Sequence, residues 1–130
     1  MDMELVERVK RERGQPTLKW HEVLAEYAPQ TLAAWHDMTM KMYAHEELDR
    51  KATEFIIVAI DAVLAWPYID IHIHKAFEAG ATIQELVETV VTAGALMGPH
   101  ALSFGLEHLD KVIRERADRG LPHPRKRSDA

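Results

Sequence analysis

The stretch LDRKATEFIIVAIDAVLAWPYIDIHIHKAFEAGAT, residues 48–82, decides the fold of this chain. Residues 54–66 are apolar on nearly every face, and such a helix is usually buried in a core or an oligomer interface. Asp49 precedes this run as a plausible N-cap. Pro67 follows it, and proline cannot continue a helix but fits the first turn of the next one. We therefore expect two consecutive helices, the second starting near Pro67 and ending before Gly80.

The segment Tyr68–His74 alternates apolar and polar residues, which taken alone is typical of a strand. The run is short, however, and leads directly into KAFEA. Gly80 then resembles a helix C-cap, and Thr82 begins a capping box for another helix. We therefore expect a helix here, on which residues four apart, such as Tyr68 and His72, share a face.

Two acidic residues, Glu54 and Asp61, interrupt the apolar helix. They are seven residues apart, so both carboxylates project from one side of it. A buried carboxylate must be paired, protonated or turned toward a cavity. Structural roles stay open beside functional ones, because Glu54 could favour the N-terminal dipole and Asp61 could form a buried salt bridge.

Helical patterns and breaker residues extend over the rest of the chain. Further helices are expected at residues 2–13, 29–43, 83–97 and 99–118, with a short helical turn at 20–27. We therefore predict an all-α fold of about six helices, a single helical domain over residues 1–119, and a flexible C-terminal tail over residues 120–130. Such apolar helices in so small a domain also predict an oligomer.

Composition excludes several functional classes. The 130 residues carry a net charge of -5, so there is no overall basic field to attract nucleic acid. The longest apolar run is too short to span a membrane, and the acidic start lacks a secretory apolar segment. These features predict a cytoplasmic protein that binds neither nucleic acid nor membrane. There are no cysteines, which excludes disulfides and thiolate metal sites.

Three motifs, LDRKATEFIIVAIDAVLA, HKAFEAGAT and IQELVETVVTAGALMG, are similar to the carboxymuconolactone decarboxylase and alkylhydroperoxidase D superfamily. The first has an acid early in an apolar helix, and a histidine lies eight residues before the glycine of the second. The resemblance covers roughly residues 28–109. It implies an alkylhydroperoxidase D-like helical bundle that forms homotrimers or homohexamers, with active sites near the subunit interfaces.

Peroxidase-type members of that superfamily use a Cys-x-x-Cys-x-x-x-His motif. Placing its histidine at His72 puts the cysteine positions at Ala65 and Tyr68, so both thiols are absent. Because a thiolate is the basis of that redox chemistry, cysteine-dependent peroxidase activity is excluded. By position, the resemblance implies Glu54 and His72 as the catalytic residues.

The decarboxylase-like members imply a lyase that acts on a small carboxylated lactone or oxo acid without a cofactor or metal. His72 would supply a proton, and Glu54 would hold its tautomer or act as the partner base. Isomerisation or hydration by the same acid and base stays open. The candidate substrate-binding residues are Tyr68, Trp66, Asp61, His74 and His100.

Two other functions compete with this interpretation. Asp70, His72, His74 and Glu54 could hold a metal ion, although histidines two apart point to opposite sides of a helix. A small-molecule-binding oligomer that kept the fold but lost the thiols is the non-catalytic alternative.

Overall fold

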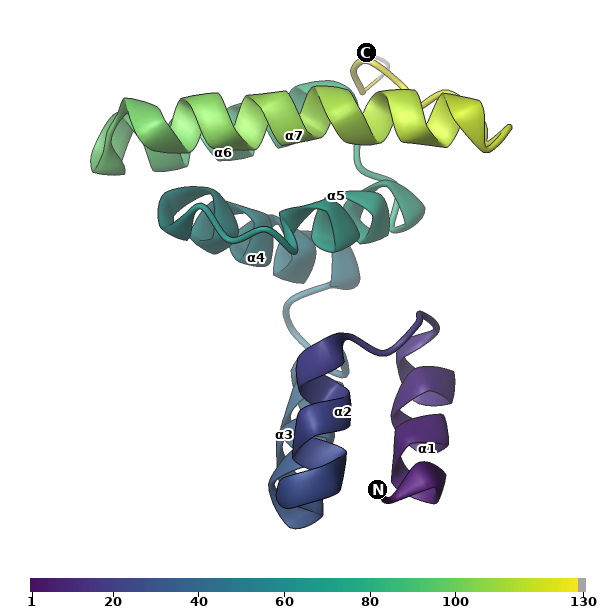
Figure 1. The fold of residues 1–130 in the computed structure, drawn as a ribbon. Coiled ribbons are helices and arrows are strands. Elements are labelled where there is room, and N and C mark those ends of the chain that lie inside the picture. The colour runs from purple at the N-terminus through teal and green to yellow at the C-terminus, as the bar shows by residue number, and fades with distance from the viewer. Residues whose placement is uncertain (129–130) are drawn as a thin grey trace. The chain divides into compact units, whose positions relative to one another are not determined.

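The computed structural model describes residues 1–128, and every regular element in that range is an α-helix (Figure 1). It contains seven helices where about six were expected, because residues 19–27 form a nine-residue helix rather than a short turn. The contacts divide the chain into two compact units, residues 1–45 and residues 46 onward. That the two units behave as the single domain 1–119 stays a prediction. No helix among the described residues is both long and apolar enough to cross a membrane.

The N-terminal unit consists of three helices: α1 (Met3–Arg13), α2 (Lys19–Tyr27) and α3 (Pro29–Tyr43). Asp2 caps α1 by accepting a hydrogen bond from the Leu5 N–H at 3.0 Å. Pro29 occupies the first turn of α3, where its missing N–H leaves no helical bond unmade. A small apolar core holds the three helices together and contains Val6, Val9, Ala25 and Leu32.

The second unit consists of α4 (Arg50–Leu64), α5 (Ile69–Glu78), α6 (Ile83–Met97) and α7 (Pro99–Asp118). Asp49 caps α4, accepting from the Ala52 N–H at 2.7 Å. Thr82 and Glu85 form the predicted capping box at the start of α6, each side chain accepting from the other residue's N–H. Both caps are local features, which is why the sequence alone predicts these two helix starts.

The helix expected after Pro67 is confirmed, although it begins at Ile69 instead of at the proline. Its alternating pattern has a tertiary explanation. Ile69 and Ile73 are fully buried, whereas the residues between them are partly exposed or face polar partners. The four-residue spacing of a helix therefore explains the burial of Ile69 and Ile73 better than the two-residue alternation of a strand does.

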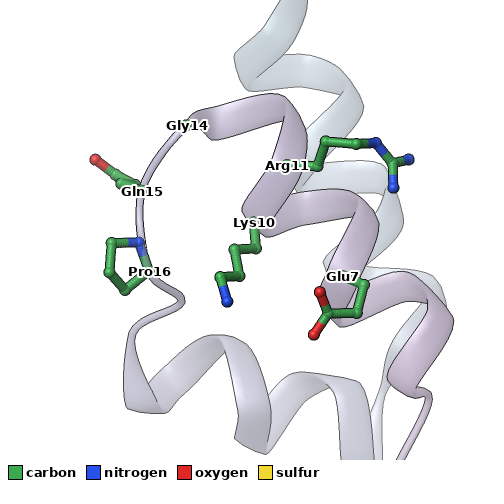
Figure 2. A pocket seen from close by; sticks show the side chains of 6 residues that line it. All are labelled: Glu7, Lys10, Arg11, Gly14, Gln15 and Pro16. Carbon is green, nitrogen blue, oxygen red and sulfur yellow. The ribbon is translucent and has the colours of Figure 1, made fainter.

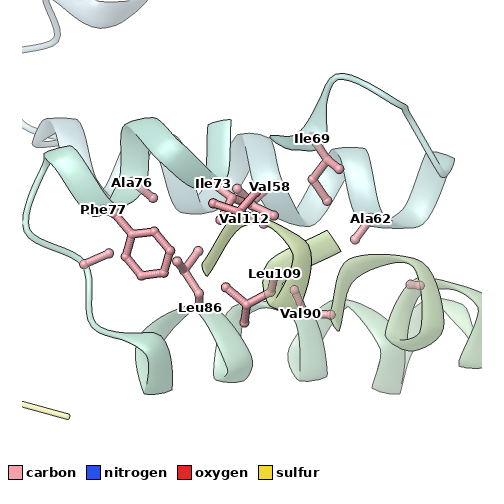
Figure 3. Close-up of a cluster of buried hydrophobic side chains, with 12 residues drawn as sticks. Val58, Ala62, Ile69, Ile73, Ala76, Phe77, Leu86, Val90, Leu109 and Val112 are labelled. Atoms are coloured by element: carbon pink, nitrogen blue, oxygen red, sulfur yellow. The ribbon is translucent and has the colours of Figure 1, made fainter. Parts of the chain in front are cut away.

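The core of the second unit is formed by side chains from all four helices, as Figure 3 shows. Helix α7 approaches the others closely at Gly105, where an added Cβ would lie 2.6 Å from Val90 Cγ1. The segment after α7 is attached to the same unit, because the Ile83 and Gln84 N–H groups donate to the carbonyls of Arg125 and Lys126 at 2.8 and 2.9 Å. The predicted tail thus runs past the first turn of α6 before residues 129–130, which lie outside the described range.

Candidate functional site

Glu54 is the most deeply buried acid of the second unit, with no exposed surface. It lies on α4 one turn after Arg50, whose Nε–H donates to Glu54 Oε1 at 3.1 Å. The other carboxylate oxygen, Oε2, accepts from His72 Nδ1 at 2.9 Å. Two donors, one on each oxygen, are the arrangement that stabilises a buried carboxylate anion. The prediction from sequence did not include Arg50, although its i,i+4 spacing to Glu54 was a usable signal.

His72 is held in one orientation by this hydrogen bond. Because a carboxylate only accepts, the proton of the neutral ring lies on Nδ1, and Nε2 has a free lone pair. Within residues 1–128, no protein group is hydrogen-bonded to Nε2. The side chain is 15% exposed, so the ring is partly open to solvent. The pair therefore has the geometry of a carboxylate-oriented acid–base histidine.

Asp61 lies on the same side of α4 as Glu54, as their spacing predicted, and is only 7% exposed. Its Oδ2 is buried without a hydrogen-bond partner among the described residues. Burial raises the pKa of Asp61 to about 6, the nearby Glu54 charge also raises it, and His72 lowers it. Asp61 is therefore a carboxyl group that carries a proton at mildly acidic pH within electrostatic reach of the Glu54–His72 pair.

Trp66 and Tyr68 lie in the turn between α4 and α5. Their rings pack edge to face with centroids 5.5 Å apart, and Trp66 remains 48% exposed. His100 lies on the first turn of α7, and its Nε2–H donates to the Val63 carbonyl at 3.0 Å. That bond satisfies one of the carbonyl groups that the last turn of α4 leaves without a helical partner. The described partner of the His100 ring is therefore the main chain of α4.

His74 belongs to a different network from His72. Its Nε2–H donates to Glu115 Oε2 at 3.1 Å, and Arg116 Nη1–H donates to its Nδ1 at 3.4 Å. Asp70 likewise contacts α7, where it pairs with His108 and Lys111. The structure thus brings Glu54, Asp61 and His72 together and turns His74 toward α7.

The residues considered for a metal site are divided among these networks. His72 contacts Glu54, His74 contacts Glu115, and Asp70 contacts α7. Within residues 1–128, no group of three or more such side chains is arranged to hold a metal ion.

Neither Glu54 nor His72 lines any of the described cavities. An apolar groove of about 640 Å³ runs between α4 and α6 and is lined by residues that include Phe55, Ile60, Val63, Leu96 and Met97. A hollow of the N-terminal unit is formed by α1 and the loop after it, with Lys10 and Glu7 beside it (Figure 2). Neither is lined by Glu54, His72 or Asp61.

The N-terminal unit also contains two buried histidines. His36 has no exposed area, and its Nε2 is 2.8 Å from Glu12 Oε1. His21 accepts from the Leu18 N–H at Nδ1, and burial lowers the pKa of its ring to about 4. The partner of His36 lies on another helix, 24 residues away in the sequence, so no local pattern indicates this pairing.

Comparison with known proteins agrees with this architecture. A crystal structure from Burkholderia xenovorans LB400, provisionally assigned as a carboxymuconolactone decarboxylase, is similar over 92% of this chain and 98% of that one, with a TM-score of 0.77 and 23% identity. At that identity the likeness shows the fold. No curated protein matches the chain at a significant level. Residues 29–111, well over half of the chain, match the carboxymuconolactone decarboxylase family. The chain therefore belongs to the carboxymuconolactone decarboxylase family.

Proposed function

We propose that the protein is a lyase that removes carbon dioxide from a small carboxylated lactone or a related oxo acid, with its own side chains as acids and bases. The observation that carries the proposal is the 2.9 Å hydrogen bond between the fully buried Glu54 carboxylate and His72 Nδ1. It orients one ring nitrogen and leaves the other for the substrate. Family membership supports the same class of reaction.

The reaction needs an acceptor for electrons and a source for one proton. As the bond between the substrate carboxylate and its neighbouring carbon breaks, carbon dioxide leaves, and the electron pair passes into the conjugated lactone or oxo group. Protonated His72 then gives its Nε2 proton to the substrate carbon and becomes neutral. Glu54 stabilises the imidazolium before the transfer, and solvent restores the proton afterwards.

Asp61 and the aromatic turn complete the proposed site. With a pKa near 6, Asp61 holds a proton at mildly acidic pH and can pass one to the site, and its Oδ2 lacks a described partner. Trp66 and Tyr68 would form one wall of the site, with apolar rings and the Tyr68 hydroxyl as a hydrogen-bonding group. Next to an apolar wall, a substrate carboxylate loses its charge more readily as carbon dioxide leaves.

The substrate pocket would be closed by another subunit, because none of the described cavities contains the Glu54–His72 pair. Large apolar side chains remain exposed on α4 and α6, among them Ile60 at 51% and Leu96 at 80%. Contiguous apolar surface of this kind usually marks an interface. We therefore include a homotrimer or homohexamer in the proposal.

The test is release of carbon dioxide from a panel of carboxylated lactones that begins with carboxymuconolactone. We expect turnover by the wild-type protein and a loss of about 10²- to 10⁴-fold in kcat for His72→Gln, because the positioned proton donor is removed. Glu54→Gln should also lose activity, since an amide does not stabilise an imidazolium as a carboxylate does.

Two exposed residues provide matched controls. His45→Gln and Glu88→Gln make the same chemical changes at surface positions and should keep wild-type turnover. Turnover that survives in His72→Gln would contradict the assigned role. Saturable binding of these acids without any turnover would instead favour the non-catalytic binding protein.

A further inference from the structure

Arg116 is the buried arginine of the second unit, with only 8% of its surface exposed. The more exposed arginines nearby have carboxylate partners: Arg50 pairs with Glu54, Arg114 with Asp110, and Arg119 with Glu115. Within residues 1–128, no carboxylate oxygen lies within 4.0 Å of the Arg116 guanidinium. A guanidinium stays charged at every accessible pH, so among residues 1–128 this buried charge lacks an ion-pair partner.

The contacts that Arg116 does make are weak for a buried cation. Its Nη1–H donates to His74 Nδ1 at 3.4 Å, and its guanidinium carbon lies 5.5 Å from the centre of the Phe77 ring. Its Nε is buried without any partner among the described residues. Glu115 accepts from Nε2–H of the same His74 ring, so the described link between this carboxylate and Arg116 passes through that ring. Buried polar atoms normally have partners, so these contacts indicate a missing one.

A small cavity of about 270 Å³ lies beside Arg116. Residues Phe77, Gly80 and Ala81 form one wall, and the segment after α7 forms the other. His123 and Arg125 line that second wall, and no aspartate or glutamate is among the described lining residues. The wall is held in place by the backbone bonds from Ile83 and Gln84. The cavity is thus lined by the buried Arg116 of α7 and, on the anchored segment, by the exposed basic residues His123 and Arg125.

We propose that this cavity binds a small oxyanion, a carboxylate or a phosphate, on the guanidinium groups of Arg116 and Arg125. A planar guanidinium matches the paired oxygens of either group, and such charge-assisted bonds are strong when solvent is partly excluded. The volume suits a small anion, because it lies below the usual range for larger organic ligands. The site is separate from Glu54 and His72, so it is independent of the proposed lyase activity.

The experiment measures thermal unfolding while sodium phosphate or sodium acetate replaces sodium chloride at constant ionic strength. We expect a saturable rise in the melting temperature with at least one of the two anions, which identifies phosphate or carboxylate as the preferred group. Arg116→Gln should abolish the rise, and Arg125→Gln should weaken apparent binding by about tenfold, since each loses a charged hydrogen-bond donor.

Arg114→Gln is the matched control, because it removes the same charge from an exposed position of α7 and should leave anion binding unchanged. If Arg116→Gln does not fold, Arg125→Gln together with an NMR titration of the wild-type His74 and His123 rings still tests the site. No saturable response to either anion, or equal losses in Arg125→Gln and Arg114→Gln, would overturn the proposal.

Discussion

Glu54 and Asp61 are two buried carboxyl groups on one face of α4 that differ in their hydrogen-bond partners. Both are buried on α4, but Glu54 has a donor on each oxygen, whereas Asp61 Oδ2 has none among the described residues. Burial without compensation disfavours the charged form, so the pKa of Asp61 rises to about 6 from an ordinary 3.8. Ionisation of Asp61 therefore lowers the stability of the folded protein.

We predict that Asp61→Asn stabilises the protein at pH 7.5 and not at pH 4. Between about pH 4 and 6 the unfolded chain loses this proton more readily than the folded one, so rising pH favours unfolding. Above pH 6 the penalty is fully present and is at most about 3 kcal/mol. Chemical denaturation at both pH values measures the difference. The exposed Asp110→Asn serves as control, and a gain from Asp61→Asn that is equal at both pH values would contradict the assigned cause.

At the scale of elements, the second unit depends on the close approach of α7 to α4 and α6. Gly105 permits it, because a Cβ there would lie 2.6 Å from Val90 Cγ1 and 3.3 Å from Ala62 Cβ. Val90 is β-branched and 1% exposed, so it has little freedom to move aside. Close packing of the helices therefore favours glycine at position 105, whereas intrinsic helix propensity favours alanine.

We predict that Gly105→Ala destabilises the protein by up to about 2 kcal/mol, because an overpacking cost of about 1–3 kcal/mol exceeds the roughly 1 kcal/mol that alanine gains in helix propensity. Chemical denaturation measures the loss. Val90→Ala removes the clashing methyl groups, so the double variant should be more stable than the sum of the two single changes predicts. An increase in stability for Gly105→Ala alone would show that α7 is not constrained at this point.

For the whole molecule, the main surface feature is an exposed apolar face of α4 and α6. Ile56, Ile60 and Leu64 follow one another at four-residue spacing on α4 and are 49%, 51% and 66% exposed. Leu96 and Met97 of α6 line the same groove. A second copy of the chain would bury this surface, in line with the oligomer proposed above.

We predict that Ile60→Glu shifts the wild-type oligomer toward the monomer, because a charge in an apolar interface must lose its water without gaining a partner. Light scattering coupled to size-exclusion chromatography measures the mass. Val23→Glu is the control, since Val23 is 46% exposed but lies on α2, outside this surface. A monomeric wild-type protein, or an unchanged mass for Ile60→Glu, would remove the oligomer from the proposal.

Helix starts were predictable because caps act over a few residues. Asp49, Thr82, Pro29 and Pro99 each mark a helix start in the sequence, and the structure confirms all four. The burial of Glu54 and Asp61 was predictable as well, because an apolar helix leaves its acids few exposed positions. The pairing of Glu54 with His72 followed from the family resemblance and not from any local pattern.

Three properties could be predicted from the sequence alone: the class of the fold, the bounds of most helices and the absence of thiol chemistry. These depend on residue type and short spacing, which are local properties. Only the packing of the helices shows that His74 turns to Glu115, that His36 is buried against Glu12, and that Arg116 lines one cavity with residues of the segment after α7. Each of these arrangements involves residues that lie on different elements, and the two histidine pairs are far apart in the sequence. They depend on how the helices pack, which helical periodicity leaves undetermined.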